Sequence, residues 1–350
     1  MTDFNDKSGS SGARPVALVL GASGGIGGAV ARRLLASGYA VRAMHRRASA
    51  QAPATPDYDW VDGDAMNRED VMRAAQGVAV IVHAVNPPGY RNWGRLVLPM
   101  INNTIAAARA AGARILMPGT IYNYHPDSFA TITEDSPQRP LTRKGRIRVR
   151  LEQRLEQAAA EGVPVILLRA GDYFGPGAGG SWFSQVMVKP GAPLKAITSP
   201  AGPGVGHQWA YLPDVAETMV RLLARAEELP AFARFHMEGV WDHDGLQLVQ
   251  AIRRVTGRPD LPVRRFPWFM VGLARPFVPL FREIHEIRYL WRQPLRLSND
   301  RLVAFLGAEP RTPLDRAVAE TLAGLGCLGN DARRPEVRSL PASGTGRPVA

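Results

Sequence analysis

The stretch of sequence that decides the fold covers residues 15–38 and reads PVALVLGASGGIGGAVARRLLASG. Its first apolar part, residues 16–20, predicts a buried parallel strand. Residues 21–27 follow at once with four glycines, and apolar side chains then recur at helical spacing as far as Gly38, a residue type that commonly ends helices. The stretch therefore predicts a strand, a glycine turn and a helix in direct succession.

This succession is the arrangement that binds the pyrophosphate of a dinucleotide. Glycine lets the backbone approach the phosphates, and the helix N-terminus offers free N–H groups and the positive end of its dipole. We therefore expect a dinucleotide here rather than a turn of purely structural use. The loop residues expected to contact it are Gly21, Ser23, Gly24, Gly25, Ile26 and Gly27.

The next predicted strand, which starts at residue 40, runs into the basic residues Arg46 and Arg47. No acidic residue lies between Gly38 and Pro56. An acid at the end of this strand would suit the ribose hydroxyls of NAD, whereas arginine suits the additional 2′-phosphate of NADP. The pattern favours NADP as the cofactor, with NAD as the alternative, and a solvated charge pair is the structural explanation that competes with both.

Two further strands bring candidate cofactor contacts to the same edge of the sheet. Residues 58–64 predict a third strand, after which Asp64 and Ala65 would face the adenine. A turn aspartate or a helix N-cap explains Asp64 equally well. Residues 79–85 predict a fourth strand, which places Ala84 and Val85 beside the cofactor. His83, inside that strand, is expected to be a packed core histidine.

Hydroxyl-bearing residues leave the predicted fifth strand, residues 114–118, at its carboxyl end. Thr120 and Tyr122 lie there, where open parallel sheets place their ligands. A helix is predicted from about residue 143, and residues 163–168 predict a sixth strand. Arg169 and Tyr173 follow that strand and are possible ligand contacts, although Arg169 could also simply tie two loops together.

The order of these elements, together with several motifs, resembles the extended short-chain dehydrogenase/reductase superfamily in its epimerase/dehydratase branch. The resemblance covers residues 15 to 325. Its motifs are the glycine loop, Asp-Gly-Asp at 62–64, Thr120-x-Tyr122, LRAGDYFGPG at 168–177, QWAYLPDVA at 208–216 and LGAEPRTPL at 306–314.

This resemblance implies an α/β protein built on a Rossmann-type doubly wound parallel sheet with a smaller C-terminal substrate lobe. The Rossmann domain would comprise residues 15–174 and 206–240, and the lobe residues 175–205 and 241–328. Residues 1–14 and 329–350 are polar or aperiodic and are expected to be disordered. The resemblance also implies hydride transfer to or from a carbonyl or secondary alcohol, often on a nucleotide-sugar, and a possible homodimer.

The chain departs from the superfamily at its reaction centre, which normally pairs Ser or Thr with Tyr-x-x-x-Lys. None of the eight tyrosines has a lysine four residues on. By resemblance, Lys144 takes the place of the tyrosine and Arg148 that of the lysine. The candidate catalytic residues are Thr120, Tyr122, Lys144 and Arg148.

The substitution limits the roles that these residues can have. Arg148 can donate to the nicotinamide ribose but cannot act as a base, because it stays protonated. A lysine one turn from a permanent cation would have a lowered pKa and act as a base, or stay protonated and hold an oxygen. Alternatively both are surface cations and no proton transfer occurs. A separate hypothesis is that the protein is a non-catalytic NADP(H)-binding regulator, which needs no proton donor.

Composition limits the partners. The 43 basic and 31 acidic residues give a net charge of +12, which suggests an anionic small-molecule substrate, and no sequence pattern indicates nucleic-acid binding. The most apolar segment, residues 266–280, is interrupted by Arg275 and three prolines and is too short to cross a bilayer, so no membrane partner is expected.

Other features point to a cytoplasmic protein without a metal. Cys327 is the single cysteine, which excludes an internal disulfide and fits a reducing compartment. Acidic residues near the N-terminus precede any apolar run, so no signal peptide is expected. Asp242, His243 and Asp244 precede a helical pattern, which favours a helix cap over a metal site.

Overall fold

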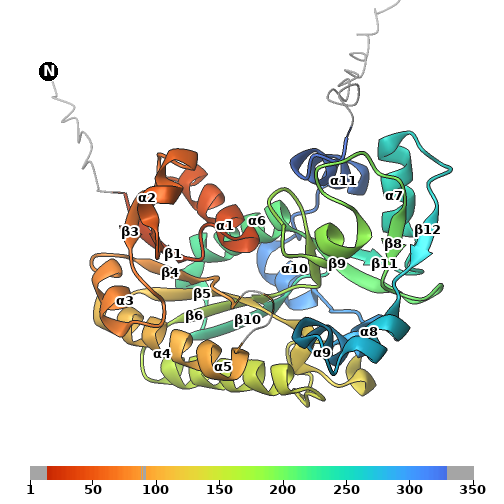
Figure 1. Ribbon diagram of the computed structural model, residues 1–350. Helices are drawn as coiled ribbons and strands as arrows, with labels where there is room; N and C mark the ends of the chain where they lie inside the picture. The colour runs from red at the N-terminus through yellow and green to blue at the C-terminus, as the bar shows by residue number, and fades with distance from the viewer. Residues whose placement is uncertain (1–13, 88, 90–91, 329–350) are drawn as a thin grey trace, which may run out of the picture.

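The computed structural model describes residues 14–87, 89 and 92–328 (Figure 1). Both predicted tails lie outside these described residues, apart from Arg14. No helix of the described part has the length and apolar character needed to cross a bilayer.

A seven-stranded parallel sheet forms the centre of the N-terminal part, in the order β10-β6-β5-β4-β1-β2-β3. The strand order changes direction between β1 and β4, and the crevice at such a switch point is where doubly wound sheets bind ligands. The predicted fold class is confirmed. The strands are β1 (Val16–Leu20), β2 (Ala40–His45), β3 (Asp59–Asp62), β4 (Val80–His83), β5 (Arg114–Gly119), β6 (Val165–Arg169) and β10 (Phe232–His236).

Helices cover both faces of this sheet, as its apolar strands require. On one face α1 (Gly25–Ala36) packs against α6 (Leu212–Ala224). On the other face α3 (Arg68–Ala74), α4 (Trp93–Ala111) and α5 (Arg143–Ala160) pack side by side (Figure 1). Val19 packs in the core between the sheet and helices α1 and α6, whereas its neighbours Leu18 and Leu20 pack in the core between the sheet and helices α3, α4 and α5. Alternate residues of β1 therefore fill opposite faces of the sheet.

A lobe with a core of its own lies beside the Rossmann part (Figure 1). It contains the three-stranded sheet β11-β9-β7 and the two-stranded sheet β12-β8. Its strands are β7 (Asp172–Phe174), β8 (Ile197–Ser199), β9 (His207–Tyr211), β11 (Val240–Asp242) and β12 (Val263–Arg265). Its helices include α7 (Gln247–Thr256), α8 (Trp268–Ala274), α9 (Pro279–Glu286) and α11 (Leu314–Gly324). The short α2 (Ala48–Gln51) belongs to the Rossmann part, and α10 (Asp300–Leu306) packs on the Rossmann core beside β10.

The position of β9 differs from the sequence-based expectation that residues 206–240 belong to the Rossmann domain. Helix α6 and strand β10 do so, but β9 pairs with β7 and β11 instead. The physical reason is burial on both sides of β9. The amide of Gln208 exchanges hydrogen bonds with the backbone of Leu297 (3.2 and 2.7 Å), and Trp209 packs in the core of the lobe.

The acidic residues before α7 form the helix cap that the sequence predicts. The carboxylate of Asp242 accepts hydrogen bonds from the backbone N–H groups of Gln247 (3.0 Å) and Leu248 (3.2 Å). Asp244 accepts one from the N–H of Leu246 (2.9 Å). Throughout the described part of the chain, no group of three or more His, Cys, Asp or Glu side chains is arranged to hold a metal ion.

Candidate functional site

The glycine loop between β1 and α1 is built so that two of its positions accept only glycine. Gly21 has φ +95°, and a side chain on it would overlap the carbonyl of Ala84. A Cβ on Gly27 would overlap the carbonyl oxygen of Gly21, which accepts the N–H of Gly24 at 2.9 Å. The loop therefore brings backbone without side chains close to the end of β4, at the edge where the strand order changes direction.

The N-terminus of α1 is open toward this edge. Gly24 is its N-cap and offers no side chain to its first turn, which also lacks acidic residues. The first-turn N–H groups and the dipole are therefore available to an anion. Ser23 and Gly24 are exposed beside it. Ala84 and Val85 follow β4 at the same place, and the N–H of Ala84 donates to Leu20 (2.9 Å).

The adenosine end of the predicted site lies beyond β2. Arg46 and Arg47 are both exposed there, and within the described residues neither guanidinium forms an ion pair with a carboxylate. Asp62, at the end of β3, is engaged by the backbone N–H of Ala48 (3.0 Å). The edge thus presents two cations to solvent.

Asp64 forms the turn before α3. Its carboxylate accepts the N–H of Met66 (2.9 Å), whereas the N-cap of α3 is Asn67. The turn explanation is therefore confirmed and the N-cap explanation is wrong, while an adenine contact by Asp64 stays a prediction. The carbonyl of Ala65 accepts a hydrogen bond from Asn103 (2.9 Å), which fixes the loop.

Arg148 lies near the end of β4, at the predicted nicotinamide end. It donates to the Asn86 side chain (3.2 Å), and its guanidinium carbon lies 4.6 Å from the centre of the Trp93 ring. The ring centroids of Trp93 and Tyr122 are 6.3 Å apart. Arg148 is 7% exposed and Lys144 0%, so the alternative that both are surface cations is wrong.

Lys144 is directed at the lobe. Its ammonium donates to the carbonyl of Glu283 (3.2 Å) and the carboxylate of Glu286 (2.6 Å), and it contacts the carboxylate of Glu283. Its backbone N–H also donates to Glu286 (3.1 Å). These contacts bring the ammonium against α9. The ammonium of Lys144 is therefore engaged by the lobe rather than directed at the nicotinamide end of the predicted site.

Glu283 and Glu286 were missed by sequence reasoning. They stand about 140 positions beyond Lys144 in the chain, and the only local signal is their spacing of three, which puts them on one face of a helix. Burial raises the pKa of Glu286, but the hydrogen bonds and charge of Lys144 outweigh it and lower the pKa below its usual range. The two acids bind the N-terminal end of α5 to the lobe.

Thr120 and Tyr122 leave β5 at the edge where the predicted site lies. The hydroxyl of Thr120 donates to the side chain of Asn123 (3.1 Å). A Cβ on Gly145 would overlap the carbonyl of Tyr122, so glycine at this position lets α5 pack directly against the loop. Tyr122 contacts both the Rossmann core and the core of the lobe, and therefore sits at their boundary.

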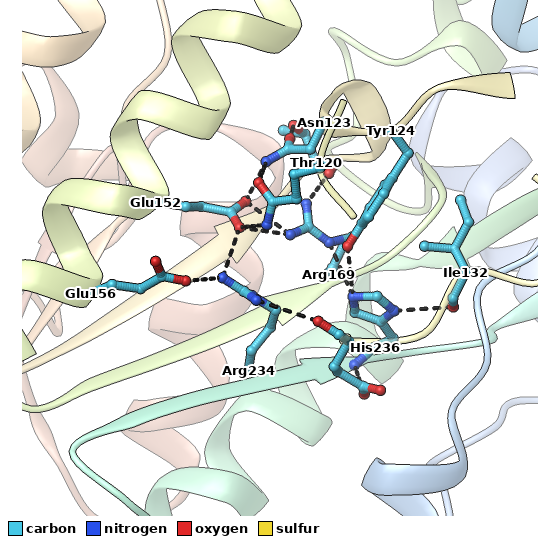
Figure 2. A network of polar contacts seen from close by, with 11 residues as sticks. Thr120, Asn123, Tyr124, Ile132, Glu152, Glu156, Arg169, Arg234 and His236 are labelled. Carbon is cyan, nitrogen blue, oxygen red and sulfur yellow. Dashed lines mark hydrogen bonds and ion pairs between the residues drawn. The ribbon is translucent and has the colours of Figure 1, made fainter. Parts of the chain in front are cut away.

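Behind this loop lies a buried polar network centred on Glu152 and Arg169 (Figure 2). The carboxylate of Glu152 accepts two hydrogen bonds from Arg169 (2.9 and 2.8 Å) and one from Asn123 (2.8 Å). Arg169 also donates to the carbonyl of Thr120 and, through Nε, faces His236 (3.2 Å). Arg169 thus ties the strand ends together, which agrees with the structural alternative given for it above.

Two other side chains singled out in the sequence are deeply buried. His83 faces the hydroxyl of Thr104 (2.8 Å), and burial, then the charge of Arg148, lowers its pKa to about 3. It is a neutral core histidine, as predicted. Burial raises the pKa of Tyr173 to about 12, which keeps its phenol protonated.

Comparison with known proteins shows which family model and which solved structures this chain is similar to. Residues 21–167 match a family model described as NAD(P)H-binding. These residues therefore form an NAD(P)H-binding domain. A putative epimerase from Burkholderia cenocepacia J2315 is 18% identical, with a TM-score of 0.69 and coverage of 89% of this chain and 98% of that one. No significant match was found among curated protein sequences.

Two further solved structures share the fold over the same fractions of the chains. A UDP-galactose 4-epimerase is 16% identical, with a TM-score of 0.67 over 89% of this chain and 98% of the other. A UDP-glucose 4-epimerase from Brucella ovis, in complex with NAD, is 18% identical with the same TM-score and coverage. The predicted resemblance to the epimerase/dehydratase branch and the prediction of a nicotinamide dinucleotide are confirmed.

The buried network predicts a large effect of Glu152→Ala. Removing the carboxylate leaves the Arg169 guanidinium buried without its counter-charge, and we expect the free energy of unfolding to fall by about 3–5 kcal/mol. Glu156→Ala is the control, because Glu156 is 44% exposed and pairs with Arg234, and it should cost about 1 kcal/mol or less. Equal losses in urea unfolding experiments would contradict this account.

The contacts of Lys144 predict a pH-dependent loss of stability in Lys144→Met. At pH 7 the variant should be less stable by roughly 3 kcal/mol, because buried carboxylates lose their partner. The lowered pKa of Glu286 means that its stabilising contribution is complete above about pH 4.3 and is lost as the pH falls through the folded-state value. The difference between parent and variant should therefore narrow in acid.

Chemical denaturation of both proteins between neutral and acidic pH measures this difference. Lys195→Met is the control, because Lys195 is exposed, and it should follow the parent curve. If the free energies of unfolding of Lys144→Met and the parent differ by the same amount at every pH, the stabilising contact between Lys144 and Glu286 would be contradicted.

Proposed function

We propose that the protein is an NADP(H)-dependent oxidoreductase of the epimerase/dehydratase type. Its substrate would be a polar, anionic small molecule that carries a carbonyl or secondary alcohol, such as a nucleotide-sugar. The observation that carries the proposal is the combination of an open helix N-terminus at the glycine loop with two exposed arginines beyond β2. One neighbouring structure, 17% identical, is in complex with UDP-glucose and NAD, which supports the substrate class.

Each part of the edge has a role in this proposal. The loop around Gly24 binds the pyrophosphate, and Arg46 and Arg47 bind the 2′-phosphate of NADP. Ala84 and Val85 line the path of the cofactor, and Arg148 donates to the nicotinamide ribose. The bound cofactor supplies or accepts the hydride.

Proton transfer is assigned to Tyr122, with Thr120 in support. When hydride adds to a carbonyl carbon, the oxygen must gain a proton. The phenol of Tyr122 lies at the boundary of the two cores, and the ring of Trp93 connects it to the cation of Arg148, whose charge would favour the phenolate left behind. The Thr120 hydroxyl holds the same oxygen.

We assign Lys144 a positioning role in place of a catalytic one. Its donors are directed at Glu283 and Glu286, so it holds α9 against the start of α5, one turn from Arg148. A direct role in proton transfer would require α9 to move away. Lys144 thereby helps to fix the lobe over the edge where the substrate would bind.

A non-catalytic regulator that binds NADP(H) is the second candidate. The observation that favours it is the lack of a Tyr-x-x-x-Lys pair together with the engagement of Lys144 by α9. Such a protein keeps the glycine loop, Arg46 and Arg148 but needs no proton donor. The two functions differ in whether NADPH is consumed.

Cofactor preference is tested with the double variant Arg46→Ala/Arg47→Ala. Each charge-assisted hydrogen bond to the 2′-phosphate contributes about 1.5–3 kcal/mol, so the Kd for NADPH should rise about tenfold or more, while the Kd for NADH stays unchanged. Calorimetry measures both. Arg68→Ala/Arg139→Ala, at two other exposed arginines, is the control. Parent protein that binds NADH as tightly as NADPH would refute the assignment.

Turnover is tested with Tyr122→Phe against a panel of aldehydes, ketones and keto-sugars. Loss of the proton donor should lower the rate of NADPH oxidation about a hundredfold or more and leave the Kd for NADPH unchanged. Tyr39→Phe, at a partly buried tyrosine of the Rossmann part, should retain full activity. A parent protein that binds NADPH and oxidises it with no compound would instead support the regulatory candidate.

A further inference from the structure

Most of the strongly exposed large apolar side chains of the described residues lie on α8, α9 and residues 275–278 between them, which we call the hairpin. Phe269 is 80% exposed and Phe277 86%, whereas outside the hairpin no large apolar side chain of the described chain exceeds the 48% of Leu141. Figure 1 shows both helices at the outer edge of the lobe. The large apolar side chains exposed on it are Phe269, Met270, Leu273, Phe277, Val278 and Leu280.

The hairpin is held in place by its inner side. Val271 is buried, and the ring N–H of Trp268 donates to the carbonyl of Pro200 (2.8 Å). Glu283 and Glu286, at the end of α9, bind Lys144. The outward apolar side chains are thus presented by an anchored element, and a cluster of this kind marks an interaction site on a folded protein.

The charges along this segment of the chain are of one sign. Residues 261–282 contain no aspartate or glutamate. The first acids after them, Glu283 and Glu286, turn inward to Lys144. The cations within the stretch, all of them exposed, are Arg264, Arg265, Arg275 and Arg282.

We propose that the hairpin docks this protein on the surface of an anionic lipid bilayer. Phenylalanine and leucine side chains enter the boundary between headgroups and acyl chains, and guanidinium groups bind the lipid phosphates. A second copy of the chain fits less well, because two such faces would bring Arg275 and Arg282 of one copy against the same two cations of the other. The expectation of no membrane partner rested on the lack of a spanning segment, and docking at the surface needs none.

The proposal is tested by co-sedimentation of the full chain with lipid vesicles. At low salt we expect binding to vesicles of phosphatidylcholine with phosphatidylglycerol and much weaker binding to phosphatidylcholine alone. Phe269→Ser/Phe277→Ser should abolish binding. Its control is Met66→Ser/Leu246→Ser, which replaces two apolar residues that are each 39% exposed elsewhere and should bind as the parent does.

Charge is tested separately with Arg275→Glu/Arg282→Glu. Each basic residue near an anionic surface contributes about 1 kcal/mol, so reversing two should lower the partition coefficient about tenfold or more. Arg68→Glu/Arg139→Glu makes the same change of charge on the Rossmann part and should leave binding near the parent value. Unchanged NADPH binding shows that each hairpin variant is folded.

Insertion is measured with an environment-sensitive fluorophore on Phe277→Cys, in a Cys327→Ser background. Its emission should shift to the blue with anionic vesicles, and the same label on Met66→Cys should not shift. The proposal is overturned if the parent protein fails to bind anionic vesicles, or if control and hairpin variants lose binding equally. If the parent binds no vesicles but self-associates, and Phe269→Ser/Phe277→Ser abolishes that self-association, the hairpin contacts a second copy of the chain and not a bilayer.

Discussion

The buried ammonium of Lys144 is the constraint on which the arrangement of the two parts depends. A charge that is fully buried must have its donors satisfied, and here α9 supplies the acceptors through Glu283 and Glu286. The contacts of Lys144 with Glu283 and Glu286 therefore join α5, the helix that carries Arg148, to the lobe. They also turn these two carboxylates of the hairpin inward, while its arginines and apolar side chains stay exposed.

Much of the Rossmann part could be predicted because its determinants are local. Gly21 and Gly27 are required by contacts within the same short loop and with β4, and the run of residues 16–20 carries its own strand signal. The cap by Asp242 acts over six residues. Such signals can be recognised in the sequence alone, and the right-handed connection of parallel strands then limits the topologies that the sheet can adopt.

The parts that could not be predicted depend on contacts between distant positions. Nothing near His207–Tyr211 indicates that this strand joins the small sheet, because the cause is the pairing of Gln208 with Leu297. Lys144 reads as a substitute for a catalytic tyrosine until Glu283 and Glu286 are seen beside it. Likewise, the apolar run at 266–280 gives no sign of which residues face outward, since prolines and Arg275 interrupt its periodicity.

The most direct test of this account is a crystal structure of the full chain with NADP⁺. We expect the pyrophosphate at the N-terminus of α1 and the 2′-phosphate between Arg46 and Arg47. Arg148 should contact the nicotinamide ribose, and the ammonium of Lys144 should remain on Glu283 and Glu286. A structure in which Lys144 has left α9 and points at the nicotinamide ring, or in which the cofactor avoids the glycine loop, would contradict the account.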